Sequence, residues 1–417
     1  MNKLIAQYRG LKKELYVLFF GRLVTAMGSF VWPMLTFFLT TKLGISDGNT
    51  TLLLATANIL ALPAAILGGK LADKYSRKRI IIFFDCATFA FYSLAAILPI
   101  SYTTAALIFV AALFQTMESP AYDALNADFS ASSQRDKAYS LSYLGFNLGY
   151  IVGASAAGLL FVNHVRLAFF LNGLAIFIST MLIAFFVKME NAVTADEKEL
   201  ETAYSEYEQP VDEKFSVLQV LADRKVVVWM LLLGCFASLP NNVLGVILPL
   251  QLKASMGEQG AAIFGYLNSL NGFVVIAFTP VLTALLRRFT EIPKAAGSLL
   301  LFLTGVAFFA TDSFVWLLFV GMFIFTLGEV VNVLGTNPYT SRRVPASHRG
   351  RVGGIVSVLH TVFGSLTQYM VSFVLIVSNS NYRLVWMIII GCGLAAVLMY
   401  TLLYHPDKKR FPLLYGK

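Results

Sequence analysis

Residues 69–79 read Gly-Lys-Leu-Ala-Asp-Lys-Tyr-Ser-Arg-Lys-Arg. Two apolar runs enclose this short basic stretch, residues 51–69 before it and residues 80–100 after it. Each run has the length of roughly 20 residues that a helix needs to cross the hydrocarbon core of a bilayer. The stretch is therefore predicted to be a short loop that joins two membrane-spanning helices.

The composition of the whole chain is that of a membrane protein. Of its 417 residues, 57% are hydrophobic and 13% are charged, whereas soluble domains carry about 25% charged residues. Disordered, collagen-like and disulfide-scaffold classes are excluded by the 13 prolines, the 3 cysteines and the 14% of aromatic residues. The cysteines (Cys86, Cys235 and Cys392) each lie in an apolar run and show no metal or disulfide spacing.

Twelve segments have the length and apolar character of membrane helices. A single long polar stretch, residues 188–225, separates the first six from the last six, and its nine acids between Glu190 and Glu213 are typical of a solvated linker. The sequence thus predicts an all-α integral membrane protein with residues 1–187 and 226–417 as two six-helix bundles and residues 188–225 as a cytoplasmic linker. The predicted spans are 14–40, 51–69, 80–100, 104–127, 138–162, 166–187, 226–250, 260–286, 295–311, 314–340, 352–378 and 383–404.

The basic residues are distributed unequally between the two sides of these spans. If the N-terminus is cytoplasmic, the short cytoplasmic segments hold 22 lysines and arginines, and the external connections hold four (Lys42, Arg166, Lys253 and Arg383). Such a bias follows the positive-inside rule and places both termini in the cytoplasm. The net charge of +9 is therefore a topology signal, and no nucleic-acid partner is expected. No cleavable leader is evident, because the first apolar run is too long.

The loop of residues 69–79 resembles the hallmark cytoplasmic loop of the major facilitator superfamily, Gly-x-Leu-Ala-Asp-Arg-x-Gly-Arg-Lys. The resemblance implies the major facilitator fold, with two pseudo-symmetric six-helix bundles and a substrate site between them near the midplane. It also implies a conformational latch formed by Gly69, Asp73 and Arg77, with Asp128 as the partner of Arg77. The sequence departs from the pattern at Ser76, where the family usually has glycine. The alternative interpretation is a basic loop that only sets topology.

Span five contains a second pattern, Gly149-x-x-x-Gly153-Ala-Ser-Ala-Ala-Gly158. It is similar to the antiporter signature Gly-x-x-x-Gly-Pro-x-x-Gly-Gly, with alanines at the proline and at the first of the paired glycines. Small residues at this spacing also permit close helix packing in any membrane protein. The pattern therefore favours an exporter only modestly.

Six ionisable residues lie inside the predicted spans, and each is a candidate functional group because charge is costly there. The resemblance implies that spans one, four, seven and ten line the cavity, and these spans hold Arg22, Glu118, Asp123 and Glu329. Arg22 and Glu118 are predicted to pair, which leaves Glu329 as the leading proton-carrying carboxylate. Of the others, Asp85 is expected to pair with loop cations and His360 to be a core residue.

The segment around Glu329, Thr-Leu-Gly-Glu-Val-Val, resembles the span-ten segment of the LmrP-type multidrug–proton antiporters. That group has further acids in spans five and seven, where this sequence has Ser142 and the pair Asn241 and Asn242. Asn241 and Asn242 follow Ser238-Leu239-Pro240, so they join a helix breaker to two amides. They are predicted to bind substrate or to bend as a gate.

The leading hypothesis is a proton-coupled exporter of lipophilic or amphipathic small molecules that works by alternating access. Alternatives on the same fold are an uptake permease for a sugar or other polar metabolite and a lipid or lysolipid flippase. No nucleophile constellation, nucleotide loop or metal site appears, so an enzyme is not expected, and no cofactor is needed beyond the proton gradient. We expect a monomeric, multi-pass protein of a bacterial cytoplasmic membrane.

Overall fold

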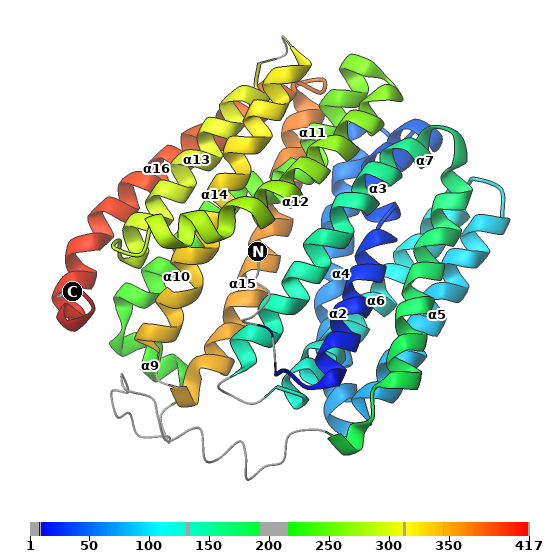
Figure 1. The fold of residues 1–417 in the computed structure, drawn as a ribbon. Coiled ribbons are helices and arrows are strands. Elements are labelled where there is room, and N and C mark those ends of the chain that lie inside the picture. The colour runs from blue at the N-terminus through cyan, green and yellow to red at the C-terminus, as the bar shows by residue number, and fades with distance from the viewer. Residues whose placement is uncertain are drawn as a thin grey trace. The chain divides into compact units, whose positions relative to one another are not determined.

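The computed structural model describes residues 8, 10–130, 134–191, 216–311, 314–344 and 346–415 (Figure 1). Within these ranges the chain is all helical and contains no strand. The central part of the predicted linker, residues 192–215, lies outside the described residues. The predicted all-α membrane fold is confirmed.

The helices of the first half of the chain follow the predicted spans. They are α2 (Lys13–Met27), α3 (Val31–Phe37) with a π-helical turn at Phe38–Lys42, α4 (Asp47–Lys74), α5 (Arg77–Ile97), α6 (Tyr102–Asp128) and α7 (Arg135–Phe186), followed by a 3₁₀ turn at Met189–Asn191. Helix α7 has 52 residues and a non-helical backbone at His164 (φ −138°, ψ 41°). At 1.5 Å per residue it is more than twice as long as the roughly 30 Å core of a bilayer, so it covers two crossings.

The second half continues in the same way after a short helix. It comprises α9 (Val217–Asp223), α10 (Lys225–Ala237), α11 (Leu239–Met256), α12 (Gln259–Leu285), α13 (Glu291–Phe309), α14 (Val315–Arg343), α15 (Ala346–Val377), α16 (Tyr382–Arg410) and a 3₁₀ turn at Pro412–Leu414. The described residues contain 11 helical stretches long and apolar enough to span a membrane. Because α7 supplies two crossings, they account for the twelve predicted spans.

Spans one and seven are each interrupted near their middle, and the break in span seven lies at the predicted helix breaker. In span one, the break between α2 and α3 is stabilised by Asn172, whose Oδ1 accepts hydrogen bonds from the amides of Phe30 and Val31, both at 3.1 Å. In span seven, the break between α10 and α11 falls at Ser238, whose hydroxyl donates to the carbonyl of Cys235 at 2.7 Å. Broken helices at corresponding positions of two halves are typical of transporter binding regions.

The chain divides into two compact units. Unit 1 comprises Met1–Ile45, Ala57–Ser205 and Leu252–Phe273, and unit 2 comprises Ser46–Thr56, Glu206–Gln251 and Val274–Lys417. Each unit therefore contains most of one half of the sequence together with a short segment from the other half.

Unit 1 is held together by close contacts of the span-five glycines with neighbouring helices. A Cβ atom at Gly149 would lie 2.2 Å from the carbonyl oxygen of Leu23 on α2, and one at Gly153 would lie 2.4 Å from that of Ala26. A Cβ atom at Gly158 would lie 2.6 Å from the carbonyl oxygen of Ala261 on α12. Close helix packing is therefore sufficient to explain why these positions are glycine.

Candidate functional site

A cluster of charged side chains lies inside unit 1. Asp85 on α5 and Glu118 on α6 are buried, with 7% and 8% of their surfaces exposed. They interact electrostatically with Arg22 on α2, and Asp123 on α6 also interacts with Arg22. Three carboxylates thus lie within electrostatic range of one guanidinium, and the two that are buried, Asp85 and Glu118, are in the kind of environment where groups that exchange protons are typically found.

The contacts inside this cluster differ from the predicted pair of Arg22 and Glu118. The guanidinium of Arg22 lies over the ring of Tyr122, 4.6 Å from its centroid, and the hydroxyl of Tyr122 donates to the carbonyl of Leu18 at 2.7 Å. Among the residues that the structure describes, no direct ion pair joins Arg22 to Glu118. Arg22 acts as a cation shared by the cluster.

Asp85 belongs to this cluster, whereas the sequence suggested that it pairs with loop cations. Its Oδ2 accepts a hydrogen bond of 2.6 Å from the hydroxyl of Thr180 on α7. The position of Asp85 inside an apolar span marked it as a candidate functional residue. Its contact with Thr180 could not be predicted, because residues 95 positions apart share no local sequence pattern. Glu329 lies half-buried on α14 in unit 2, so it is not part of the same unit as the cluster.

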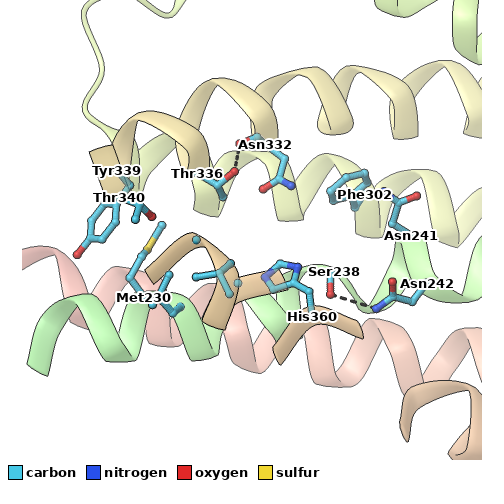
Figure 2. Close-up of a pocket in the computed structure, with 14 residues that line it drawn as sticks. Met230, Ser238, Asn241, Asn242, Phe302, Asn332, Thr336, Tyr339, Thr340 and His360 are labelled. Atoms are coloured by element: carbon cyan, nitrogen blue, oxygen red, sulfur yellow. Dashed lines mark hydrogen bonds between the residues drawn. The ribbon is translucent and has the colours of Figure 1, made fainter. Parts of the chain in front are cut away.

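Unit 2 contains a pocket of about 580 Å³ (Figure 2), a size typical of small-molecule sites. The pocket includes the predicted residues Asn241 and Asn242, and His360 lines it instead of packing in the core. The sequence did not single out Asn332, Thr336 or Tyr339, which reach the pocket from α14. Its lining residues are Met230, Leu231, Gly234, Ser238, Asn241, Asn242, Phe302, Asn332, Thr336, Tyr339, Thr340, Gly353, Val356 and His360. None of them is acidic, and His360 is the one ionisable base in this set.

The loop between α4 and α5 brings together part of the predicted latch. Arg77 at the start of α5 forms an ion pair with Asp128 at the end of α6 and donates to the carbonyl of Ala124 at 3.3 Å. Asp73 is exposed. Ser76 has a φ of −58°, so the turn does not need the left-handed conformation for which the family's usual glycine would be suited.

Of the two glycines before this loop, Gly68 makes the closer helix contact. A Cβ atom at Gly68 would lie 2.1 Å from the carbonyl oxygen of Met117 on α6, whereas one at Gly69 would have its nearest neighbour at 4.0 Å. The packing requirement therefore falls on Gly68, one position before the glycine of the motif.

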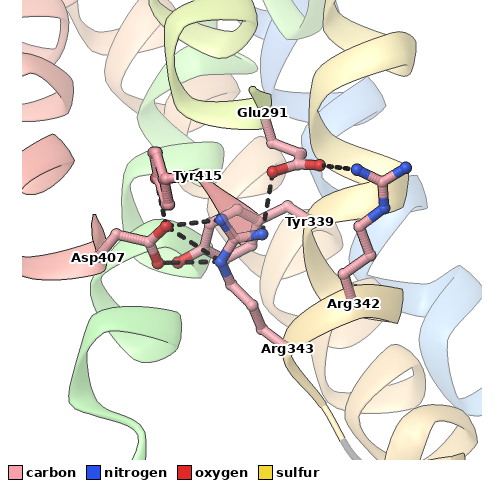
Figure 3. A network of polar contacts seen from close by, with 6 residues as sticks. All are labelled: Glu291, Tyr339, Arg342, Arg343, Asp407 and Tyr415. Atoms are coloured by element: carbon pink, nitrogen blue, oxygen red, sulfur yellow. Dashed lines mark hydrogen bonds and ion pairs between the residues drawn. The ribbon is translucent and has the colours of Figure 1, made fainter. Parts of the chain in front are cut away.

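A buried polar network joins the ends of three helices in unit 2 (Figure 3). The carboxylate of Asp407 on α16 is fully buried and binds Arg343 of α14, with 2.6 Å between Oδ2 and Nη2. Arg343 also pairs with Glu291 of α13 at 3.0 Å. Asp407 accepts further hydrogen bonds from the hydroxyls of Tyr339, at 2.8 Å, and Tyr415, at 2.5 Å.

The contacts of this network favour the protonated forms of Arg343 and Tyr415. Burial of the Arg343 guanidinium disfavours its charge, but the hydrogen bonds and charge of Asp407 outweigh this and raise the pKa of Arg343. Burial and the hydrogen bond to Asp407 raise the pKa of Tyr415. Arg343 is therefore a permanent cation, and its partners Glu291 and Asp407 are anchored to it.

Units 1 and 2 each contain an ion pair between the start of one helix and the end of the next helix. The acid and the base have exchanged places between the two units. In unit 1 the base, Arg77, begins α5 and the acid, Asp128, ends α6. In unit 2 the acid, Glu291, begins α13 and the base, Arg343, lies at the end of α14. The sequence did not single out Glu291 or Arg343, and the available signal was an acid at the start of one predicted span and a basic end of the next.

Comparison with known proteins gives related sequences and structures. The chain is 24% identical over 401 residues to a Na(+), Li(+), K(+)/H(+) antiporter of Planococcus maritimus, covering 91% of this chain and 93% of the relative. It is 29% identical over 137 residues to the uncharacterized MFS-type transporter YqjV of Bacillus subtilis (strain 168), covering 32% of each chain.

Solved transporter structures share the fold. A POT family transporter in complex with 5-aminolevulinic acid has a TM-score of 0.76 at 14% identity, with 98% of each chain covered. A mutant of the nucleoside transporter NupG has a TM-score of 0.72 at 13% identity, with 94% of this chain and 99% of that chain covered. The sequence profile described as Major Facilitator Superfamily matches residues 18–368, so the chain belongs to this superfamily of secondary transporters.

Proposed function

We propose that the chain is an antiporter that couples proton entry to the export of a cationic solute by alternating access. The observation that carries the proposal is the cluster of Asp85, Glu118 and Asp123 around Arg22. Buried carboxylates that share a single cation can take up and release protons as their surroundings alternate between two sides. The pocket of unit 2 has no such acid, so we assign proton carriage to unit 1.

The first candidate for the exported solute is a monovalent metal cation. The relative from Planococcus maritimus, which aligns over nearly its whole length, is named as an antiporter of Na⁺, Li⁺ and K⁺ against H⁺. Carboxylate oxygens are suited to this exchange, because they can bind a proton or a hard cation. Among the described residues no group of three or more acidic, histidine or cysteine side chains is placed to hold a metal ion, so the proposal needs a carboxylate that binds the cation with solvent or main-chain oxygens.

The second candidate is a lipophilic or amphipathic organic molecule, as in the multidrug antiporters that the sequence resembles. The pocket of unit 2 supports it, because about 580 Å³ is far larger than a metal ion needs. Its lining joins apolar side chains, such as Met230 and Phe302, to amides, such as Asn241 and Asn242. We further propose that the protein is a monomer in a bacterial cytoplasmic membrane with both termini in the cytoplasm.

Everted membrane vesicles from cells that produce the protein provide the test. Respiration acidifies the vesicle interior and quenches a pH-sensitive dye, and we expect added Na⁺, Li⁺ or K⁺ to restore the fluorescence within seconds. Ethidium added in place of the salts tests the second candidate. Vesicles without the protein are the control. Fluorescence that neither the salts nor ethidium restores would contradict proton-coupled antiport.

We also propose that the loop at residues 69–79 is a conformational latch, with Arg77 fixed by Asp128 and Asp73 available to cap a helix end. Because Arg77→Ala removes the ion pair with the mostly buried carboxylate of Asp128, we expect a several-fold lower transport rate at normal expression. Asp73→Asn removes one charge from an exposed side chain. The latch proposal predicts that this variant also has a lower transport rate. Arg79→Ala, which changes an exposed residue of the same loop, is the matched control. Wild-type rates in both Asp73→Asn and Arg77→Ala would leave the loop with a role in topology alone.

A further inference from the structure

The pocket of unit 2 contains a buried amide oxygen that has no hydrogen-bond partner among the described residues. This atom is Oδ1 of Asn332 on α14, and Asn332 lines the pocket (Figure 2). A buried acceptor that the protein itself leaves without a donor is costly unless another molecule supplies one. A donor supplied by a bound molecule would remove this cost.

Three other polar side chains of the pocket donate hydrogen bonds elsewhere. The hydroxyl of Thr336 donates to the main-chain carbonyl of Asn332 itself, at 2.8 Å. The hydroxyl of Ser238 donates to the carbonyl of Cys235 at 2.7 Å, and the side-chain amide of Asn242 donates to Ser238 Oγ at 3.1 Å. The acceptor of Asn332 is therefore left for a group that comes from outside the chain.

The helix that carries Asn332, α14, is anchored near its C-terminal end by the buried contacts of Tyr339. Asn332, Thr336, Tyr339 and Thr340 share one face of α14, because they follow one another at helical spacing. Tyr339 is 1% exposed, its hydroxyl binds Asp407 (Figure 3), and Arg343 lies 4.0 Å above its ring centroid. A group on a helix anchored in this way can recognise a ligand by geometry, since side chains held by packing lose little freedom on binding.

We propose that Asn332 is the specificity-determining residue of this pocket and accepts a hydrogen bond from an N–H or O–H group of the solute. The apolar body of the solute then lies against Met230 and Phe302, which line the same pocket. The inference rests on the second candidate solute of the proposed function. It adds that a solute of the same shape without a donor binds more weakly, because it leaves Oδ1 of Asn332 unpaired.

Two matched ligands test this preference on the purified protein. Ethidium carries two aromatic amino groups, and the phenanthridinium without these groups has the same ring system and charge. We expect the wild-type protein to bind ethidium about tenfold more tightly, which corresponds to the net contribution of one hydrogen bond. Fluorescence titration gives the dissociation constant of ethidium, and displacement of ethidium gives that of the analogue.

Asn332→Leu is expected to weaken ethidium binding about tenfold and to abolish the preference, while the analogue binds as before. Asn241→Leu, which removes another amide from the same pocket, is the control and should keep the preference. Asn332→Asp keeps an acceptor and should bind ethidium at least as tightly as the wild type, so it tests the proposal if Asn332→Leu does not fold.

The proposal is overturned if Asn332→Leu keeps the preference for ethidium, if the preference follows Asn241, or if the wild-type protein binds neither compound. The exchange of Na⁺, Li⁺ and K⁺ for protons in vesicles is measured separately. Failure of ligand binding with intact cation exchange would reject this inference and leave the antiport proposal standing. If cation exchange fails while the protein still binds ethidium more tightly than the analogue, the antiport proposal is rejected and this inference stands.

Discussion

Replacing Arg343 by methionine is expected to destabilise the protein by about 3–5 kcal/mol, the cost typical of removing one partner from a buried ion pair. Asp407 is fully buried and Glu291 is 2% exposed, so both carboxylates would remain in the interior without their shared cation. The midpoint of unfolding in mixed detergent micelles, titrated with sodium dodecyl sulfate, measures the change.

The chain offers a matched control at the same end of α16. Arg410 pairs with Asp223 at 2.7 Å, but the two side chains are 48% and 64% exposed. Exposed pairs of this kind contribute about 0–1 kcal/mol, so Arg410→Met should hardly move the midpoint. Equal shifts for Arg343→Met and Arg410→Met would show that burial of the Arg343 network adds nothing to stability.

A double substitution separates the ion pair from its surroundings. Arg343→Met combined with Asp407→Asn removes both charges, and it should be less destabilising than the sum of the single changes. Glu291 still has Arg342, with 2.6 Å between Nη1 and Oε1, so it keeps a cation in the double variant. A purely additive result would mean that the two charges do not depend on one another.

The sequence predicted the features that depend on local composition. Apolar runs of span length indicated the helices, and the break at His164 lies between the predicted spans 138–162 and 166–187. The proximity of Arg77 to Asp128 followed from the family resemblance of the loop, and the structure contains that ion pair. These predictions succeed because a span or a loop motif is encoded by residues that are close together in the sequence.

The remaining features join distant parts of the chain. Arg343 and Asp407 are 64 positions apart, and the break in span one is capped by Asn172, 142 positions from Phe30. A hydropathy pattern records the period of a helix but not which faces meet, so it cannot reveal such contacts. For the same reason the predicted pair of Arg22 and Glu118 did not include Asp85 beside them.

Replacing Glu118 by glutamine is expected to abolish proton-coupled transport in vesicles, reducing the flux at least about a hundredfold. The amide has nearly the same shape as the protonated acid, so the fold should persist, but it cannot release a proton. Glu258→Gln is the control, because Glu258 is an exposed acid that pairs with Lys42 at 2.6 Å and should transport normally.

The exchange of labelled solute for unlabelled solute distinguishes a proton carrier from a structural acid. This exchange needs the alternation of the binding site but no net movement of protons. A Glu118→Gln protein that has lost proton carriage alone should therefore continue it near the wild-type rate. Loss of both activities together with low expression would assign Glu118 a structural role.

Glu329→Gln decides between the two carboxylates that have been proposed to carry the proton. Glu118 is buried in a cluster that also contains Asp85 and Arg22, whereas Glu329 lies half-buried on α14 in the other unit. If the cluster carries the proton, Glu329→Gln retains coupled flux, and any effect on the solute appears as a changed apparent affinity. If coupled flux instead disappears in Glu329→Gln and survives in Glu118→Gln, proton carriage belongs to α14. Arg22 and its neighbouring carboxylates in unit 1 would then have a structural role.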